Sequence, residues 1–371
     1  MKLLIVTQVI DTEHPILGFF HRWVEEFAKH CEHVHVICLQ AGKHSLPANV
    51  TVHSLGKERT KGPILRRSGT TGKVGPLVNV LQTLLQKLRY TLRFYQLIWS
   101  LRHEYDHVFV HMNQIYVILG APFWRAAGKK VGLWYAHGTV SRSLQLAVKP
   151  SHIVFTSTKE GMRIETNKRA IVGQGIDTDF FKPLPKETNT ILQLITVGRL
   201  SQSKNIETLL DACTQLKNNN IAFHFSIIGP AITPTEERYA EKIKKQCDDL
   251  GLEKEVTWVG AISQSALPAY LQKAEVFIHD GSTDSLDKAL LEAVLCGCVV
   301  VSSNPAYRAI TEKLAPALLF SPHDAPALAS TLQTLSHQPP NIRQQIMQPV
   351  FTFIHESYSI SKLISGIVSR Y

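Results

Sequence analysis

Two segments in the second half of the chain combine residue types that could bind an anionic ligand. The first, VGRLSQSKN at 197–205, places Arg199 and Lys204 between an apolar strand-like run and a helical one. Because the N–H groups at a helix start attract anions, two cations at this point predict a clamp for a diphosphate. A solvated basic loop would have the same composition, so this segment alone leaves both interpretations open.

The second segment, GSTDSLDKALLEAVLCGCVVV at 281–301, crowds three acids onto the pattern of a buried helix followed by a buried strand. We expect a helix over 285–296, with Asp284 or the next serine capping its start and Asp287 in its first turn, where the helix dipole favours negative charge. Capping does not explain Glu292, which stands among apolar residues where an unpaired charge is costly to bury. We therefore expect Glu292 to meet a protein cation or the hydroxyls of a ligand.

Parallel sheets are the elements that could position these segments, because the chain alternates between short apolar runs rich in β-branched residues and longer helical patterns. Near-continuous apolar strands joined by helices are typical of parallel sheets covered on both faces. The strands that we expect are 3–9, 33–39, 107–112, 131–138, 152–158, 169–175, 192–198, 223–229, 256–260, 274–280, 298–303 and 317–320. The pattern predicts an α/β fold with two doubly wound halves.

The division between the halves is expected at 182–190, where two prolines and polar residues interrupt both periodicities. A chain of 371 residues also exceeds what one hydrophobic core usually fills. We therefore predict two Rossmann-like domains, 1–182 and 183–356, which face each other across a cleft that collects ligands beyond the strand ends. A last helix, at about 357–371, could pack back on the first domain.

Composition limits the classes of function that the chain can have. The formal net charge of +10 is compatible with nucleic acid, an anionic membrane or an anionic small substrate. The six cysteines lack zinc-type pairing and the 17 histidines lack a metal-binding motif, so no metal is expected. The sequence has no recognised nucleic-acid motif, which argues against a nucleic-acid partner. No leader peptide or spanning run is recognisable, so a cytoplasmic location is expected.

A basic segment at 57–103 contains ten Lys or Arg residues against the single acid Glu58. Within it, residues 77–101 repeat apolar side chains at helical spacing, which a helix packed on the core of the first domain would explain. The basic residues before this helix could instead hold the chain against anionic lipid, at about 1 kcal/mol per cation. A peripheral position on the inner face of the cell membrane is therefore the alternative to a freely cytoplasmic one.

Taken in order, these segments resemble family 4 of the retaining glycosyltransferases, within the glycosyl transferases group 1, whose GT-B architecture has two facing Rossmann-like domains. In that family two glutamates separated by seven residues open the penultimate strand–helix unit, and D-S-L-D-K-A-L-L-E places Asp284 and Glu292 on these positions. V-G-R-L-S-Q-S-K-N matches the family's phosphate-binding stretch, and G-Q-G-I-D-T-D-F-F at 173–181 is similar to the segment that ends its first domain. The resemblance covers essentially the whole chain and is stronger in the second half.

The resemblance implies roles for the matching residues of the second domain. Glu292 would bind the ribose hydroxyls of a nucleotide sugar, and Arg199 and Lys204 would bind its diphosphate. Asp284 would face the sugar ring, although it is one methylene shorter than the glutamate usual in the family.

Further roles follow for the helix start and for the first domain. The backbone N–H groups of Asp287, Lys288 and Ala289 would meet the phosphates, and the Lys288 side chain could add a charge. Asp287 and Lys288 replace a glycine–apolar pair that is common in the family. Gly18, in ILGFFHRW, corresponds to the glycine-rich loop after the first strand, and His137, in YAHG, to a histidine that reaches the transferred sugar.

A chain of this family is expected to move a hexosyl group from a UDP- or GDP-sugar to a carbohydrate or lipid-linked acceptor, with retention of configuration, in envelope polysaccharide or glycolipid synthesis. The protein's own cations would neutralise the leaving diphosphate, so neither a metal nor another cofactor is expected. Asp177 and Asp179 form an Asp-x-Asp pair, but such a pair binds a divalent cation in the other major architecture, which has one sheet. The alternatives are a sugar-nucleotide epimerase or phosphorylase of the same fold, or a catalytically silent protein that binds nucleotide sugars or polyanions.

Overall fold

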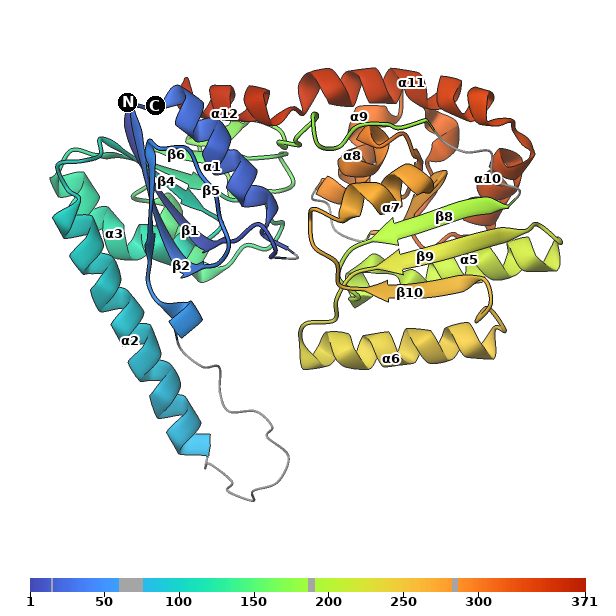
Figure 1. Cartoon of the computed structure of the whole chain (residues 1–371), viewed down its shortest axis with the longest axis horizontal. Coiled ribbons are helices and arrows are strands. Elements are labelled where there is room, and N and C mark those ends of the chain that lie inside the picture. The colour runs from blue at the N-terminus through green and yellow to red at the C-terminus, as the bar shows by residue number, and fades with distance from the viewer. Residues whose placement is uncertain (15, 60–75, 186–190, 282–285) are drawn as a thin grey trace. The chain divides into compact units, whose positions relative to one another are not determined.

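The computed structural model describes residues 1–14, 16–59, 76–185, 191–281 and 286–371. Two compact α/β units account for them (Figure 1). Unit 1 comprises Met1–Thr156, Ile164–Ala170 and Ile364–Tyr371, and unit 2 comprises Ser157–Arg163 and Ile171–Leu363. The expected linker at 182–190 falls within the second unit, and its residues 186–190 lie outside the described part.

Unit 1 contains a seven-stranded sheet with the order β3-β2-β1-β4-β5-β6-β7. The pairs from β3 to β6 are parallel. The strands are β1 Lys2–Ile10, β2 His33–Ala41, β3 Val50–Ser54, β4 His107–His111, β5 Lys130–Trp134, β6 Ile153–Thr156 and β7 Arg169–Ile171. The helices are α1 Phe19–His30, the short 3₁₀ helix η1 Lys57–Arg59, α2 Pro76–Ser100, α3 Gln114–Ala126 and α4 Arg142–Val148.

The core of unit 1 forms where apolar strands are buried on both faces. Residues 3–6 of the central strand β1 are completely buried, as expected for a parallel sheet with helices on each side. The C-terminus belongs to this core, because the Tyr371 hydroxyl donates a hydrogen bond of 2.7 Å to the Val108 carbonyl oxygen of β4. Helix α12 (Ile360–Val368) leads to this end of the chain, and its residues from Ile364 onward belong to unit 1.

Unit 2 contains a five-stranded sheet, all parallel, with the order β10-β9-β8-β11-β12. Its strands are β8 Leu192–Val197, β9 Phe223–Ile228, β10 Val256–Gly260, β11 Val276–His279 and β12 Val299–Ser302. Its helices are η2 Gln202–Lys204, α5 Ile206–Asn218, α6 Pro234–Asp249, α7 Leu267–Lys273, α8 Lys288–Leu295, α9 Pro305–Thr311, η3 Pro316–Leu318, α10 Ala325–His337 and α11 Pro340–Ser357. Right-handed crossovers place α5 and α6 on one face and α8 on the other.

The predicted α/β class with two parallel-sheet halves is confirmed, and three local expectations need correction. The expected strand at 317–320 is instead the 3₁₀ helix η3, because Pro316 starts a helical turn and only Leu319 bridges to β12. Strand β3 was not expected, since its side chains are only partly buried and carry no continuous apolar signal. The helix expected from 285 begins at Lys288.

In the part of the chain that the structure describes, no helix is both long enough and apolar enough to cross a bilayer.

Candidate functional site

The candidate site in unit 2 lies where the strand order reverses, between the neighbouring strands β8 and β11. The loops that follow these two strands leave the same edge of the sheet, which is where ligands bind in open parallel sheets. The two loops touch, because the Asn205 side-chain amide donates a 3.0 Å hydrogen bond to the carbonyl oxygen of Asp280. Gly198, at the end of β8, leaves room for Lys204, whose Cε would lie 2.8 Å from a Cβ at that position.

Lys204 and Asp287 form an ion pair between the two loops, and both side chains are largely buried. The imidazole Nε2 of His279 lies 3.4 Å from the Lys204 Nζ and 3.4 Å from the Asp287 Oδ2. Burial alone would raise the pKa of the Asp287 carboxyl, but the charge of Lys204 and the hydrogen bond with His279 outweigh it and hold that pKa well below its usual range. Asp287 is therefore ionised, and it neutralises a cation that the sequence assigns to a diphosphate.

Asp287 is also the N-cap of α8, which corrects the expectation that Asp284 or its neighbour caps this helix. The Asp287 side chain accepts a 3.3 Å hydrogen bond from the backbone N–H of Ala289. The carboxylate thus meets one of the N–H groups that the sequence assigns to phosphate binding. Asp284 itself lies outside the described residues.

His279 was not singled out from the sequence, although it ends strand β11 at the point where functional side chains collect. Its side chain is buried, and its Nδ1 lies 3.3 Å from the Ser302 hydroxyl at the end of β12. Burial and the charge of Lys204 lower the pKa of this imidazole, so His279 is neutral at neutral pH. The only sequence signal for it is a polar residue directly after the apolar run VFI.

Asp280 links the two loops through hydrogen bonds, and it was likewise not singled out from the sequence. It is completely buried. Its carboxylate accepts hydrogen bonds from the Ser303 hydroxyl at 2.6 Å and from the backbone N–H of His323 at 3.1 Å. Because its carbonyl oxygen also accepts from Asn205, this one residue links the segments after β8, β11 and β12.

Glu292 is 5% exposed and lies in the middle of α8. Its Oε1 accepts a 3.2 Å hydrogen bond from the Gln264 side-chain amide, and Lys288 lies one helical turn before it. Burial raises the pKa of Glu292, while the charge of Lys288 and the bond from Gln264 act in the opposite direction. Burial lowers the pKa of Lys288 to about 8, although the negative charges of Glu292 and Asp177 act to raise it. The polar partner expected for Glu292 is thus Gln264, with Lys288 as the nearby cation.

Arg199 leaves the same loop as Lys204 but has a different partner. Its guanidinium Nη1 lies 3.0 Å from Glu236 Oε1, and about half of its side chain is exposed. Glu236 is fixed by a capping box with Thr233 at the start of α6. The T-x-x-E pattern reveals the cap in the sequence, whereas the pair with Arg199 depends on the packing of α6 beside the β8 loop.

The candidates of unit 1 follow three neighbouring strands of its sheet. Gly18 precedes α1 after β1, and the exposed His137 follows β5, with its Nδ1 accepting a 3.2 Å hydrogen bond from the backbone N–H of Thr139. His111 ends β4 between them and is buried, stacked on Phe20 with ring centroids 3.9 Å apart. Gly18 and His137 thus lie at the carboxyl edge of one sheet, and His111 packs within the core.

Among the described residues, no group of three or more His, Cys, Asp or Glu side chains could hold a metal ion. The Asp177 carboxylate of the Asp-x-Asp pair accepts hydrogen bonds from the backbone N–H groups of Asp179 and Phe180, at 3.2 and 3.1 Å.

Comparisons with known sequences agree on one group of proteins. Residues 176–348, which contain the cluster around Lys204 and Glu292, match the family model described as glycosyl transferases group 1. WcaL of Escherichia coli, named as a glycosyltransferase of colanic acid biosynthesis, is 32% identical over 46% of this chain and 42% of its own length. The amylovoran biosynthesis glycosyltransferase AmsK of Erwinia amylovora is 28% identical over 47% of this chain and 44% of its own length. The chain therefore spans less than half the length of these curated relatives.

Comparison with solved structures extends the likeness in fold to the whole chain. HepE of Anabaena, solved in complex with UDP-glucose, superposes with a TM-score of 0.72 at 16% identity and covers 100% of both chains. At this identity the likeness shows the fold, which is that of GT-B glycosyltransferases. Residues 176–348 of the chain are therefore similar to the glycosyl transferases group 1.

Proposed function

We propose that the chain transfers a hexosyl group from a UDP- or GDP-sugar to a saccharide or lipid-linked acceptor in the synthesis of a cell-envelope polysaccharide or glycolipid. One observation carries this proposal: the cationic Lys204 and the buried Glu292 are positioned by β8, β11 and α8 at the switch point of unit 2. The names of WcaL and AmsK, which refer to exopolysaccharide synthesis, and the UDP-glucose in the HepE structure support the same class.

The two ends of a nucleotide sugar make different demands, and the site offers a group for each. The diphosphate needs fixed positive charge, which Lys204, Arg199 and the start of α8 supply. The ribose needs acceptors for its hydroxyls, and the carboxyl group of Glu292 offers oxygens that can accept such bonds. We assign the remaining roles from the family resemblance: Asp284 and His137 would contact the transferred sugar, and Gly18 would lie against the donor.

The transfer step depends on stabilising the diphosphate as it leaves. Negative charge grows on the diphosphate as the anomeric C–O bond breaks, and preorganised cations lower the energy of that state. Because Lys204, Arg199 and Lys288 provide this charge from the chain itself, we propose a reaction that needs neither a metal nor another cofactor. The acceptor hydroxyl attacks the anomeric carbon from the same face and its proton passes to the oxygen of the leaving diphosphate, so that the anomeric configuration is retained.

The acceptor determines where the reaction would take place. A lipid-linked acceptor would hold the enzyme at the inner face of the cell membrane, where the cations of residues 57–103 favour an anionic surface. The protein would then be cytoplasmic and peripheral.

Transfer can be tested with the purified chain, a panel of UDP- and GDP-sugars, and saccharide or lipid-linked acceptors. Mass spectrometry should detect a glycosylated acceptor, and the variants Lys204→Ala and Glu292→Gln should lose at least about a hundred-fold in rate. Lys245→Ala, an exposed lysine on α6, is the matched control and should keep full activity. An epimerised donor without transfer, or full activity in both site variants, would overturn the proposal.

A further inference from the structure

Helix α2 of unit 1 has an apolar surface that the described residues leave exposed. Six large apolar side chains on it are between 41% and 59% exposed, namely Leu84, Leu85, Leu88, Leu92, Tyr95 and Trp99. At about 100° per residue, these positions fall within roughly a third of the helix circumference. A continuous stripe of this size on a monomer usually marks a binding surface.

The remaining faces of α2 show why the stripe is not part of the core. Phe94, Leu97 and Ile98 are buried against unit 1 and lie on a different side of the helix. From Gln82 to Thr91 no side chain is fully buried, and this half of α2 extends away from the sheet of its own unit (Figure 1). Among the described side chains of α2, from 82 to 100, the expectation of a core-packed helix is therefore met only from Phe94 onward.

The charges beside the stripe favour an anionic partner. Lys87, Arg89 and Arg93 are exposed on α2, and residues 82–103 contain no Asp or Glu. A helix with a leucine-rich face and basic flanks is typical of one that lies in the interface of an anionic bilayer. A second copy of the chain fits less well, because a two-fold interface would bring these cations together without an acid to pair them.

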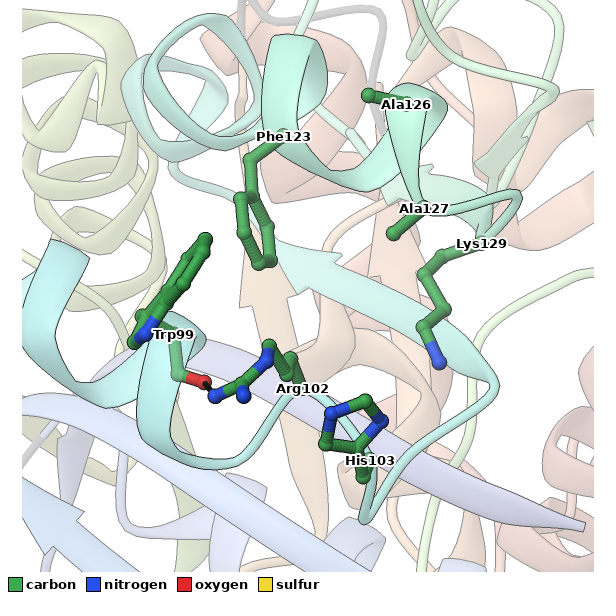
Figure 2. Close-up of a pocket in the computed structure, with 7 residues that line it drawn as sticks. All are labelled: Trp99, Arg102, His103, Phe123, Ala126, Ala127 and Lys129. Atoms are coloured by element: carbon green, nitrogen blue, oxygen red, sulfur yellow. Dashed lines mark hydrogen bonds between the residues drawn. The ribbon is translucent and has the colours of Figure 1, made fainter.

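A surface hollow of about 470 Å³ continues the stripe at the C-terminal end of α2. Figure 2 shows Trp99 and Phe123 on its apolar side, and their ring centroids lie 5.6 Å apart. Arg102, His103 and Lys129 line the rest of it. An apolar wall beside three basic groups suits the boundary between the phosphate of a lipid headgroup and the acyl region.

The basic groups of the hollow are held in place by the fold. The Arg102 guanidinium lies 4.7 Å from the Trp99 ring centroid and donates a 2.9 Å hydrogen bond to the Trp99 carbonyl oxygen. Lys129 donates a 2.5 Å hydrogen bond to the Tyr105 carbonyl oxygen. Tryptophan and arginine side by side are common at membrane interfaces, where the ring is half buried and the cation reaches the phosphates.

We propose that the exposed stripe of α2, together with the hollow formed by Trp99, Arg102, His103, Phe123 and Lys129, docks unit 1 on an anionic lipid bilayer. The leucines enter the interface, and the cations meet the headgroup phosphates. This surface belongs to unit 1 alone. The inference rests on the peripheral membrane position in the proposed function and assigns it a surface, and vesicle binding can be measured without any transfer activity.

Vesicle sedimentation with the full chain tests the proposal. Phosphatidylcholine vesicles that contain phosphatidylglycerol should bind the protein, and pure phosphatidylcholine should bind it at least about ten-fold more weakly. Replacement of Leu84, Leu88 and Leu92 by Gln should weaken binding to the anionic vesicles by about a hundred-fold. Arg102→Gln should weaken it about five-fold.

The control variant is Leu184→Gln, which changes an apolar side chain of equal exposure elsewhere in the chain (50%) and should bind vesicles like the wild type. Since all substituted leucines are exposed, unchanged circular dichroism is expected for the triple variant. Absence of wild-type binding to anionic vesicles, or equal binding by the triple variant, would overturn the proposal. If the wild type is a dimer in sedimentation velocity and the triple variant is a monomer, the stripe binds a second copy of the chain instead. If the wild type binds RNA and the triple variant does not, the stripe binds nucleic acid instead.

Discussion

Lys204 and Asp287, 83 residues apart in the sequence, are ion-paired where the loops after β8 and β11 meet. The pair means that the ammonium group proposed for the donor diphosphate already has an anionic partner. In the proposed reaction a nucleotide sugar would therefore share or replace the Asp287 carboxylate, and part of its binding energy would be used for that exchange.

Asp287→Asn should tighten nucleotide binding. Asparagine caps a helix about as well as aspartate, so α8 should keep its start while Lys204 loses its competing carboxylate. We expect UDP or GDP to bind about ten-fold more tightly in calorimetry, a change of about 1.4 kcal/mol. Asp324→Asn, which changes the N-cap of α10 in the same way, should leave the affinity unchanged. Weaker binding by Asp287→Asn would mean that the carboxylate itself assists the donor.

Glu292→Gln should remove the recognition of ribose while the helix stays intact. Glutamine has nearly the same shape but offers one acceptor oxygen in place of two, and a buried hydrogen bond left unmade costs about 1 to 3 kcal/mol, so the dissociation constant of the nucleotide should rise by roughly ten- to a hundred-fold. The same measurement with a 2′,3′-dideoxy nucleotide completes a double-mutant cycle. The wild type should lose affinity for this analogue, and Glu292→Gln should show little additional loss. Additive losses would place the ribose away from residue 292.

The Lys288 ammonium should make nucleotide binding depend on pH. Burial lowers the pKa of this group to about 8 from its usual 10.5, so the cation is lost as the pH rises through about 8. We expect nucleotide affinity to fall between pH 7.5 and 9.5 in the wild type. Lys288→Arg should give a flat profile, because arginine stays charged over this range. A flat wild-type profile would exclude Lys288 from the phosphate site.

The same titration should change the stability of the protein in the opposite direction. Between pH 8 and 10.5 the unfolded chain binds more protons at residue 288 than the folded one. The free energy of unfolding should therefore rise with pH over this window, as far as this group determines it. Chemical denaturation of the wild type and of Lys288→Met at both ends of the window measures this contribution, which the variant should lack.

The sequence predicts the strands of this fold well because most of them are buried on both faces and appear as apolar runs. The prediction fails where a buried segment is not a strand or where a strand is not buried. Leu318 and Phe320 are buried, yet their segment forms a 3₁₀ turn. Strand β3 is only partly buried and lacks an apolar run. The Lys204–Asp287 pair could not be predicted, because it depends on which strands become neighbours and on a helix that starts three residues later than its pattern indicates. Topology, rather than local propensity, decides both.

Asp280 should act as a positioning residue whose loss affects stability and binding together. It is completely buried, and its two carboxylate oxygens accept from the Ser303 hydroxyl and the His323 backbone N–H. In Asp280→Asn, the side-chain NH₂ group would face either the Ser303 hydroxyl or the His323 N–H, so that two hydrogen-bond donors meet. A buried donor or acceptor left unsatisfied costs about 1 to 3 kcal/mol. Urea denaturation of the full chain should therefore show that the free energy of unfolding of unit 2 is lower by that amount.

The effect on ligand binding distinguishes positioning from simple destabilisation. Asp280 joins the β8 and β11 loops through Asn205, so the folded Asp280→Asn protein should bind nucleotide several-fold more weakly even at low temperature, where it remains native. Ser303→Ala is the graded comparison, because it removes one hydrogen bond of the same carboxylate and introduces no opposing donor. It should lose about 1 kcal/mol of stability and keep most of its nucleotide affinity. Equal affinity in Asp280→Asn and the wild type would show that the loops hold the Lys204–Asp287 pair without this carboxylate.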